Sequence, residues 1–355
     1  MPALGREPGP GPELDISLLA GFSFACRPDC GLCCFAAPRL EGDDEARLRS
    51  AAPTAHLEGG AGGRRVAAHA NGGACTLLRR LRCSVHAARP APCREFPVSV
   101  HIGTRLQASL VLSCPGLSLG PIPLFGSGIL PPPFSGLDSE IKSVRERITP
   151  AVERTLRDAE RRRRRVVRVL SESGRWVDEG EVRERLRKER LTPAADEYLP
   201  DELPSADQGL DRLPIFFDGR PGPVALAESA GGWEALELSP DGGARSVGLA
   251  VPPDDPPSLL PEAERLLEGY LRYWLARDCF LAAVHQDMLA APGGDVVEAT
   301  LDELHAIASD VLARGAVRAR LGGEAGARLS GTDVERGIRA TDQDWLDRAT
   351  WGSRL

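Results

Sequence analysis

The 355-residue sequence lacks long apolar runs and any pattern typical of a targeting peptide. No stretch approaches the roughly 20 apolar residues that a membrane helix needs, so we expect no membrane-spanning segment. Residues 1–14 are rich in proline and glycine and include acidic side chains, which is unlike a signal or transit peptide. We therefore expect a cytoplasmic protein with no membrane partner.

Lysine is also scarce, because only Lys142 and Lys188 are lysines among the 44 basic residues. We attribute this scarcity to the base composition of the gene rather than to function. The formal net charge of -7 at pH 7 argues against general nucleic-acid binding. No Ser-His-Asp, Walker or HExxH pattern occurs in the sequence. The glycine-rich residues 59–63 and 126–128 do not join a clear strand to a clear helix, so we interpret both as loops.

Glycine and proline, in contrast, are abundant, with 38 and 30 residues. This content predicts long loops within an α+β fold. We expect a flexible tail at residues 1–20, a loop-dominated, cysteine-rich metal domain at 21–119 and a proline- and glycine-rich linker at 120–138. A mostly helical C-terminal domain follows at 139–355, with a small antiparallel meander of short strands at 213–252.

The hydrophobic period predicts the elements of this C-terminal domain. The expected helices cover residues 139–171, 179–191, 261–288, 295–315 and 333–348. The expected strands cover residues 213–217, 224–229, 233–238 and 245–251. Pro261 suits the first turn of a helix, Asp295 can cap the next helix, and Gly315 can end it.

The cysteines are the most informative feature of the sequence. Eight of the nine lie between Cys26 and Cys114, whereas Cys279 stands alone. Without an export signal, such a dense group more often binds a metal than forms disulfides. Thiolates on a tight loop supply several soft donors at a low cost in chain entropy. The candidate metal ligands are Cys26, Cys30, Cys33, Cys34, Cys75, Cys83, Cys93 and Cys114.

The spacing of these cysteines defines two groups. The first four thiols occur within nine residues, and Gly31 permits a backbone turn that directs this loop inward. The adjacent Cys33 and Cys34 more easily serve neighbouring ions than a single ion, or one of them binds the metal while the other packs. The remaining four cysteines are more widely spaced. His56 and His86 are alternative ligands, although we expect a loop or surface position for both.

Together these residues resemble the YkgJ-type CxxCxxCC cysteine-cluster family of zinc- or iron-chelating proteins. The matching residues are Phe24, Cys26, Cys30, Gly31, Cys33, Cys34, Cys75, Leu77, Cys83, Arg89, Pro90, Cys93, Arg94, Phe96, Pro97, Cys114, Pro115 and Gly116. The similarity covers roughly the first third of the chain. Two departures are the three-residue gap after Cys26 and Ser84-Val85-His86, where an aromatic residue is common.

The resemblance implies a bound metal ion or cluster, and cysteine-only ligation suits both zinc and iron–sulfur clusters. We favour an iron–sulfur cluster, [4Fe–4S], with a structural or redox role, over a structural zinc. Eight thiolates would furnish two four-thiolate sites, or one cluster and structural spares. Six arginines are candidates to offset the thiolate charge by hydrogen bonds to sulfur, namely Arg27, Arg79, Arg80, Arg82, Arg89 and Arg94.

Two other functions remain open. The cysteine pattern is distantly similar to that of flagellin-type lysine N-methylases, which would imply S-adenosylmethionine as cofactor and a protein substrate; otherwise a redox partner is expected. The sequence has no Rossmann-type methyl-donor loop, and whether the protein is an enzyme stays open. The run Arg161–Arg165 would suit RNA, but we expect a solvated helix face there. We expect Cys279 to be a buried, inert thiol.

Overall fold

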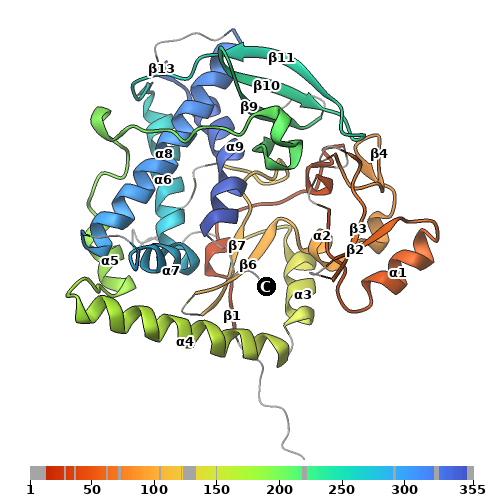
Figure 1. Cartoon of the computed structure of the whole chain (residues 1–355), viewed down its shortest axis with the longest axis horizontal. Helices are drawn as coiled ribbons and strands as arrows, with labels where there is room; N and C mark the ends of the chain where they lie inside the picture. Colours follow the sequence, from red (N-terminus) through yellow and green to blue (C-terminus); the bar gives the residue numbers. More distant parts are fainter. Residues whose placement is uncertain are drawn as a thin grey trace, which may run out of the picture.

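The computed structural model describes residues 13–27, 29–35, 37–60, 63–70, 73–103, 105–120, 122, 133–148, 150–217, 222–290, 293–323 and 328–349. These residues form an α+β fold, as predicted. In Figure 1 the cysteine-rich part, coloured red to orange, occupies one side and the long helices the other. Most of the predicted linker at 120–138 and of the predicted tail at 1–20 lies outside the described residues.

The helical side is built around α8 (Val296–Leu321), which packs against α9 (Gly331–Ala349) and α6 (Pro261–Ala276). Asp295 caps α8 as predicted, because its carboxylate accepts from the N–H groups of the first turn. Gly315 does not end this helix, so that prediction was wrong. A Cβ atom at Gly315 would lie 2.8 Å from the carbonyl oxygen of Asp333, so glycine here lets α9 approach closely.

A three-stranded sheet that the sequence analysis did not predict lies between this helical layer and the cysteine-rich part. Its order is β1 (Leu14–Asp15), β7 (Leu106–Leu110) and β6 (Val98–Ile102), with β1 parallel and β6 antiparallel to β7. Every residue of β7 is buried, so the strand shows no alternation of apolar and polar residues. The hydroxyl group of Tyr273, on α6, accepts from the Leu110 N–H at 2.7 Å.

The predicted meander is confirmed as a four-stranded antiparallel sheet. Its order is β11 (Ala244–Ala250), β10 (Gly232–Leu238), β9 (Val224–Ser229) and β8 (Ile215–Phe216). Figure 1 shows β9, β10 and β11 across the end of the helical layer that carries β13. The predicted turn at 218–219 lies outside the described residues.

The helix predicted over 261–288 is two helices, α6 and α7 (Asp278–Asp287). The break is at Arg277, whose backbone is extended and whose side chain is fully buried. Its guanidinium lies 4.1 Å from the ring centroid of Trp274, bonds to the Leu110 carbonyl at 2.8 Å and pairs with Asp342 at 3.3 Å. These tertiary contacts hold Arg277 outside helical geometry, and local sequence does not reveal them.

The remaining helices follow the prediction with shifted ends. The stretch predicted over 139–171 is divided into α3 (Asp138–Arg147) and α4 (Pro150–Glu172), because Ile148 is extended before Pro150. The helix α5 (Glu179–Leu186) ends five residues earlier than predicted. None of the helices in the described ranges is long and apolar enough to cross a membrane.

The cysteine-rich part contains only short elements. They are α1 (Asp44–Ala51), α2 (Ala91–Glu95), the hairpin β2 (Leu57–Gly60) with β3 (Gly63–Val66), and the hairpin β4 (Leu78–Arg79) with β5 (Arg82–Cys83). On the helical side, β12 (Ser258–Leu259) pairs in parallel with β13 (Arg328–Leu329). The largest apolar core includes Leu19, Leu110, Tyr270 and Val311, so it draws on both predicted domains. Their boundaries stay a prediction.

Candidate metal centre

The first cysteine group forms a loop that packs on the β4–β5 hairpin. Its single 3₁₀ turn covers Leu32–Cys34, and Gly31 before it has a left-handed φ of 63°. A Cβ atom at Gly31 would lie 3.2 Å from the Leu78 side chain, so glycine serves both the turn and the close approach. The loop leaves Cys26 exposed and buries Cys30 and Cys34.

The second cysteine group approaches this loop through backbone hydrogen bonds. The Cys75 N–H donates to the Cys34 carbonyl at 2.7 Å. Residue Cys83 lies opposite Leu78 in the β4–β5 hairpin. The two residues at the hairpin tip, Arg80 and Leu81, both have positive φ, as a two-residue turn between strands requires. The hairpin therefore places Cys75 and Cys83 beside the first loop.

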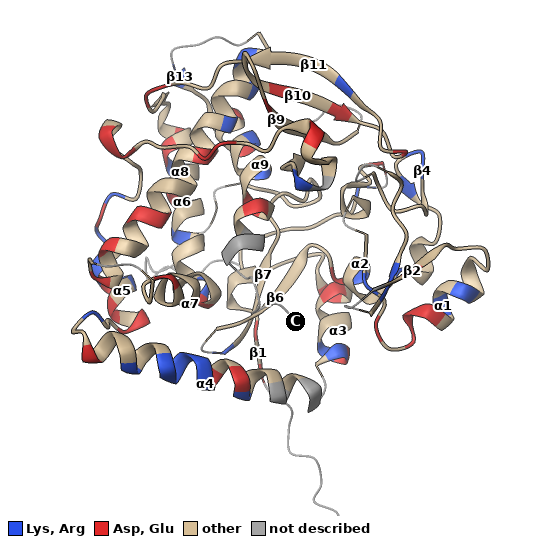
Figure 2. Ribbon diagram, in the orientation of Figure 1, with Lys and Arg blue, Asp and Glu red and all other residues tan. Residues whose placement is uncertain are grey.

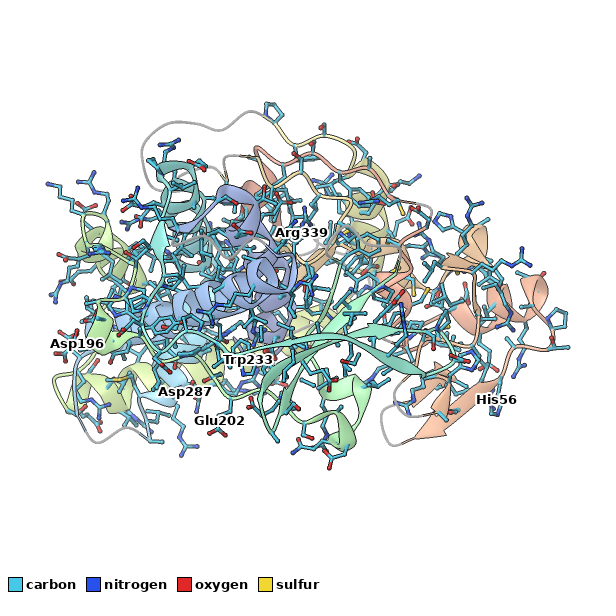
Figure 3. The ribbon with its side chains drawn as sticks, turned by 90° about the horizontal axis from the view of Figure 1, so that it is seen from above. His56, Asp196, Glu202, Trp233, Asp287 and Arg339 are labelled. Atoms are coloured by element: carbon cyan, nitrogen blue, oxygen red, sulfur yellow. The ribbon has the colours of Figure 1, made fainter. Side chains whose placement is uncertain are left out.

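The last two cysteines come from α2 and from the turn after β7. Cys93 lies on α2, and Cys114 lies in a turn whose Gly116 carbonyl accepts from the Ala25 N–H at 2.9 Å. The carbonyl of Cys114 accepts from Arg339 Nη1 at 2.6 Å. Arg339 belongs to α9 and lies near the middle of the molecule in Figure 3, so the long helices fix one end of the cysteine-rich part.

All nine cysteines are free thiols, and the eight candidate ligands form one electrostatic group. Burial is the largest cause that raises the thiol pKa of Cys26, Cys30, Cys75, Cys93 and Cys114, and charge at Cys33 adds to it for each of them. A hydrogen bond to Cys33 is the largest cause that raises the pKa of Cys34, and charge at Cys83 raises that of Cys33 in turn. Burial raises the pKa of Cys30 and Cys75 to about 11 and that of Cys114 to about 12. Cys33 is therefore the residue that links the two sequence groups.

Four of the thiols share a local hydrogen bond that favours the thiolate. The sulfur of each accepts the backbone N–H of the residue two positions later, which lowers its pKa against the effect of burial. These pairs are Cys30 with Leu32, Cys75 with Leu77, Cys83 with Val85, and Cys114 with Gly116. Hydrogen bonds of this kind orient metal ligands and tune a bound centre.

Cys34 behaves differently from these four thiols. Its thiol is hydrogen-bonded to Cys33 and Cys83, which raises the pKa of Cys34 and lowers the pKa of the other two. Among the described residues, no three His, Cys, Asp or Glu side chains are arranged as an ion-binding group. The donor set suits a soft metal, but the thiols bond to one another, so metal binding requires them to rotate.

The other predicted candidates lie away from this group or have other contacts. His86 is exposed, and His56 is exposed at the periphery of the molecule in Figure 3. Cys279 is buried in α7, as predicted. The arginine run on α4 is exposed and partly paired with acids, because Arg161 pairs with Asp158 and other members pair likewise. Figure 2 shows this blue run along the outer edge, as expected for a solvated face.

The sequence analysis missed two contributors to the site. The four backbone N–H groups that donate to sulfur cannot be identified from residue type. A hydrogen bond from the N–H of the second following residue to a cysteine sulfur is nevertheless a local feature of a tight turn. Arg339 is separated from Cys114 by 225 positions, and nothing near it in the sequence indicates the contact. Only the folded chain brings α9 to the cysteine-rich part.

The fold and the site define a cysteine-rich region joined to a helical layer. Residues 25–114 match the model of the CxxCxxCC family, described as a "putative zinc- or iron-chelating domain". The match covers about a quarter of the chain, includes all eight candidate ligands and confirms the resemblance seen in the sequence. No curated protein and no solved structure matches the chain.

Proposed function

We propose that residues 25–114 hold an iron–sulfur cluster through cysteine thiolates, with a structural or electron-transfer role. The observation that carries the proposal is the set of N–H···S hydrogen bonds at Cys30, Cys75, Cys83 and Cys114. Each of these bonds stabilises the thiolate, which is the form that binds a metal. These four residues are our primary ligands, and the remaining four thiols complete the donor set.

Two features favour a cluster over a single zinc ion. Structural zinc takes four ligands and often includes histidine, whereas this group offers eight thiols. Both histidines suggested by the sequence are exposed, and neither is among the groups that shift the pKa of a candidate thiol. When bound, an iron–sulfur cluster accepts and returns electrons. The chain's own residues would supply the thiolates and the hydrogen bonds to sulfur.

A methylase function finds no support in the comparisons. The matched family model describes metal chelation alone, and no curated protein with methyl-transfer activity matches. We therefore propose neither S-adenosylmethionine as a cofactor nor a lysine-containing protein as a substrate.

The proposal is tested by comparing Cys75→Ala with Cys279→Ala in anaerobically purified protein. Both side chains are buried, with exposed fractions of 5% and 1%, so the two variants remove similar packing. We expect Cys75→Ala to lose most of the bound iron and sulfide, and Cys279→Ala to retain both. Equal metal content in the two variants would overturn the assignment of Cys75. Stoichiometric zinc without iron would overturn the cluster and leave a zinc site.

A further inference from the structure

Arg89 lies in the chain between two candidate ligands, Cys83 and Cys93. It follows a 3₁₀ turn over His86–Ala88 and precedes α2. The N–H of Cys93 donates to the Pro90 carbonyl at 3.0 Å. The carbonyl of Arg89 accepts from Nη1 of Arg94 at 3.4 Å. The backbone that carries Arg89 is therefore fixed on both sides by contacts within this segment.

The thiols whose pKa is lowered by the charge of Arg89 come from several segments. Its charge lowers the thiol pKa of Cys26 and Cys33 in the first loop, of Cys83 on β5 and of Cys93 on α2. Only Cys83 among these four also accepts one of the backbone N–H groups described above. The charge of Arg89 therefore favours the thiolate form in the first loop, on β5 and on α2.

Other arginines of this region have further partners and act on fewer thiols, since Arg27 lowers the pKa of Cys30 and Arg79 that of Cys75. Arg27 stacks over Phe217, with 5.0 Å between its guanidinium carbon and the ring centroid. Arg79 donates to the Leu78 carbonyl at 3.2 Å. Arg94 turns toward α3 and donates to Ser143 Oγ at 3.4 Å. Of the six arginines expected to offset thiolate charge, Arg89 alone acts on four of the thiols.

The side chain of Arg89 also contains a donor that lacks an acceptor. Its Nε–H is inaccessible to solvent, and no acceptor lies within hydrogen-bonding distance among the described residues. A buried donor without a partner is unfavourable, so such groups usually have an acceptor in the functional state. Thiols are weak acceptors, whereas a metal-bound thiolate or an inorganic sulfide carries the negative charge that a guanidinium prefers.

We propose that Arg89 is a positioning residue of the metal centre, whose buried Nε–H donates a hydrogen bond to a sulfur atom of the bound group. This inference rests on the proposed metal-binding function. It makes Arg89 a determinant of metal affinity, because the hydrogen bond forms only when the centre is loaded. In the metal-free protein this Nε–H has no acceptor among the described residues, so its removal breaks no hydrogen bond.

The test compares Arg89→Gln, Arg89→Lys and Arg65→Gln in the full-length chain. Arg65 lies on β3 in the cysteine-rich part, is 60% exposed and pairs with Glu58, so Arg65→Gln removes the same charge from this part without removing the buried donor. Zinc affinity is measured by competition with a chromophoric chelator, and iron and sulfide content by anaerobic reconstitution. Unfolding of the metal-free variants by urea is measured in parallel.

Arg89→Gln is expected to weaken zinc binding about 10-fold or more and to lower the iron content, as loss of an outer hydrogen-bond partner does at other metal sites. Arg89→Lys should recover part of the affinity, and Arg65→Gln should match the wild type. The urea midpoint of metal-free Arg89→Gln should not fall, which separates positioning from a structural role. An Arg89→Gln variant that binds zinc as tightly as the wild type would overturn the inference. A lower urea midpoint in the metal-free Arg89→Gln variant would overturn it as well. A wild-type protein that binds neither metal would instead refute the proposed function.

Discussion

Replacing Arg339 with methionine tests how the helical layer supports the metal centre. The Arg339 guanidinium donates to the carbonyls of Leu112, Cys114 and Leu117 at 3.3, 2.6 and 3.0 Å, and pairs with Glu335 at 2.7 Å. Its side chain is only 9% exposed. Methionine keeps most of the volume of the arginine stem but donates no hydrogen bond. The three carbonyls of the Cys114 turn would then lose their common partner.

The expected cost follows from these contacts. Removing one partner of a buried, charged hydrogen-bond network costs about 3–5 kcal/mol, because the remaining polar groups stay desolvated. That is a large part of the roughly 5–15 kcal/mol by which proteins of this kind are stable. We therefore expect Arg339→Met to lower the free energy of unfolding in urea by about 3–5 kcal/mol and to reduce metal content.

A matched control is Arg161→Met on α4. The Arg161 side chain is 77% exposed and pairs with Asp158, one turn earlier. An exposed pair of this kind contributes about 0.5 kcal/mol or less, so the control should unfold nearly as the wild type does. A loss below about 1 kcal/mol in Arg339→Met would refute the estimated energy. Full metal content in a destabilised Arg339→Met would refute the link between α9 and the centre.

Three further predictions concern the loop, the helix crossing and the pH dependence. Gly31→Ala should lower the free energy of unfolding in urea more than Gly42→Ala does, because both positions have left-handed φ but only Gly31 faces neighbouring atoms. Equal losses in the two variants would contradict the packing of the loop on the hairpin. Gly337→Ala places its Cβ against a carbonyl of α8 and should cost about 2–3 kcal/mol in thermal unfolding, whereas Gly293→Ala meets no atom within 4 Å and should stay near wild type. Burial lowers the pKa of His285 in the folded protein below its ordinary value of 6.5. Between the lowered pKa and 6.5 the unfolded state binds more protons than the folded state, so stability rises with pH in that window. His285→Gln should flatten this rise below pH 6.5, and an unchanged rise there would argue against a neutral, buried His285.

Local features of the fold were predictable from the sequence. The Asp295 cap, the first-turn Pro261 and the meander follow from contacts within a few residues, and all three are confirmed. The sheet of β6 and β7 was missed because its strands are buried on both faces and show little polar alternation. The break at Arg277 was missed because its causes lie on distant elements.

The candidate site shows the same division. The spacing of the cysteines and Gly31 indicates which segments converge, and the family match supports metal chelation. The sequence could not single out Arg89 among six arginines, because only the fold shows which guanidinium lies near four thiols. It could not identify Arg339 either, since that contact joins residues 225 positions apart.

The most direct test of the central claim is metal and sulfide analysis of anaerobically purified protein, combined with its visible spectrum. We expect a brown protein with bound iron and inorganic sulfide, and with absorbance at roughly 400 nm that dithionite bleaches. A colourless protein with stoichiometric zinc would contradict the iron–sulfur assignment. A protein with neither metal would contradict metal binding by Cys30, Cys75, Cys83 and Cys114.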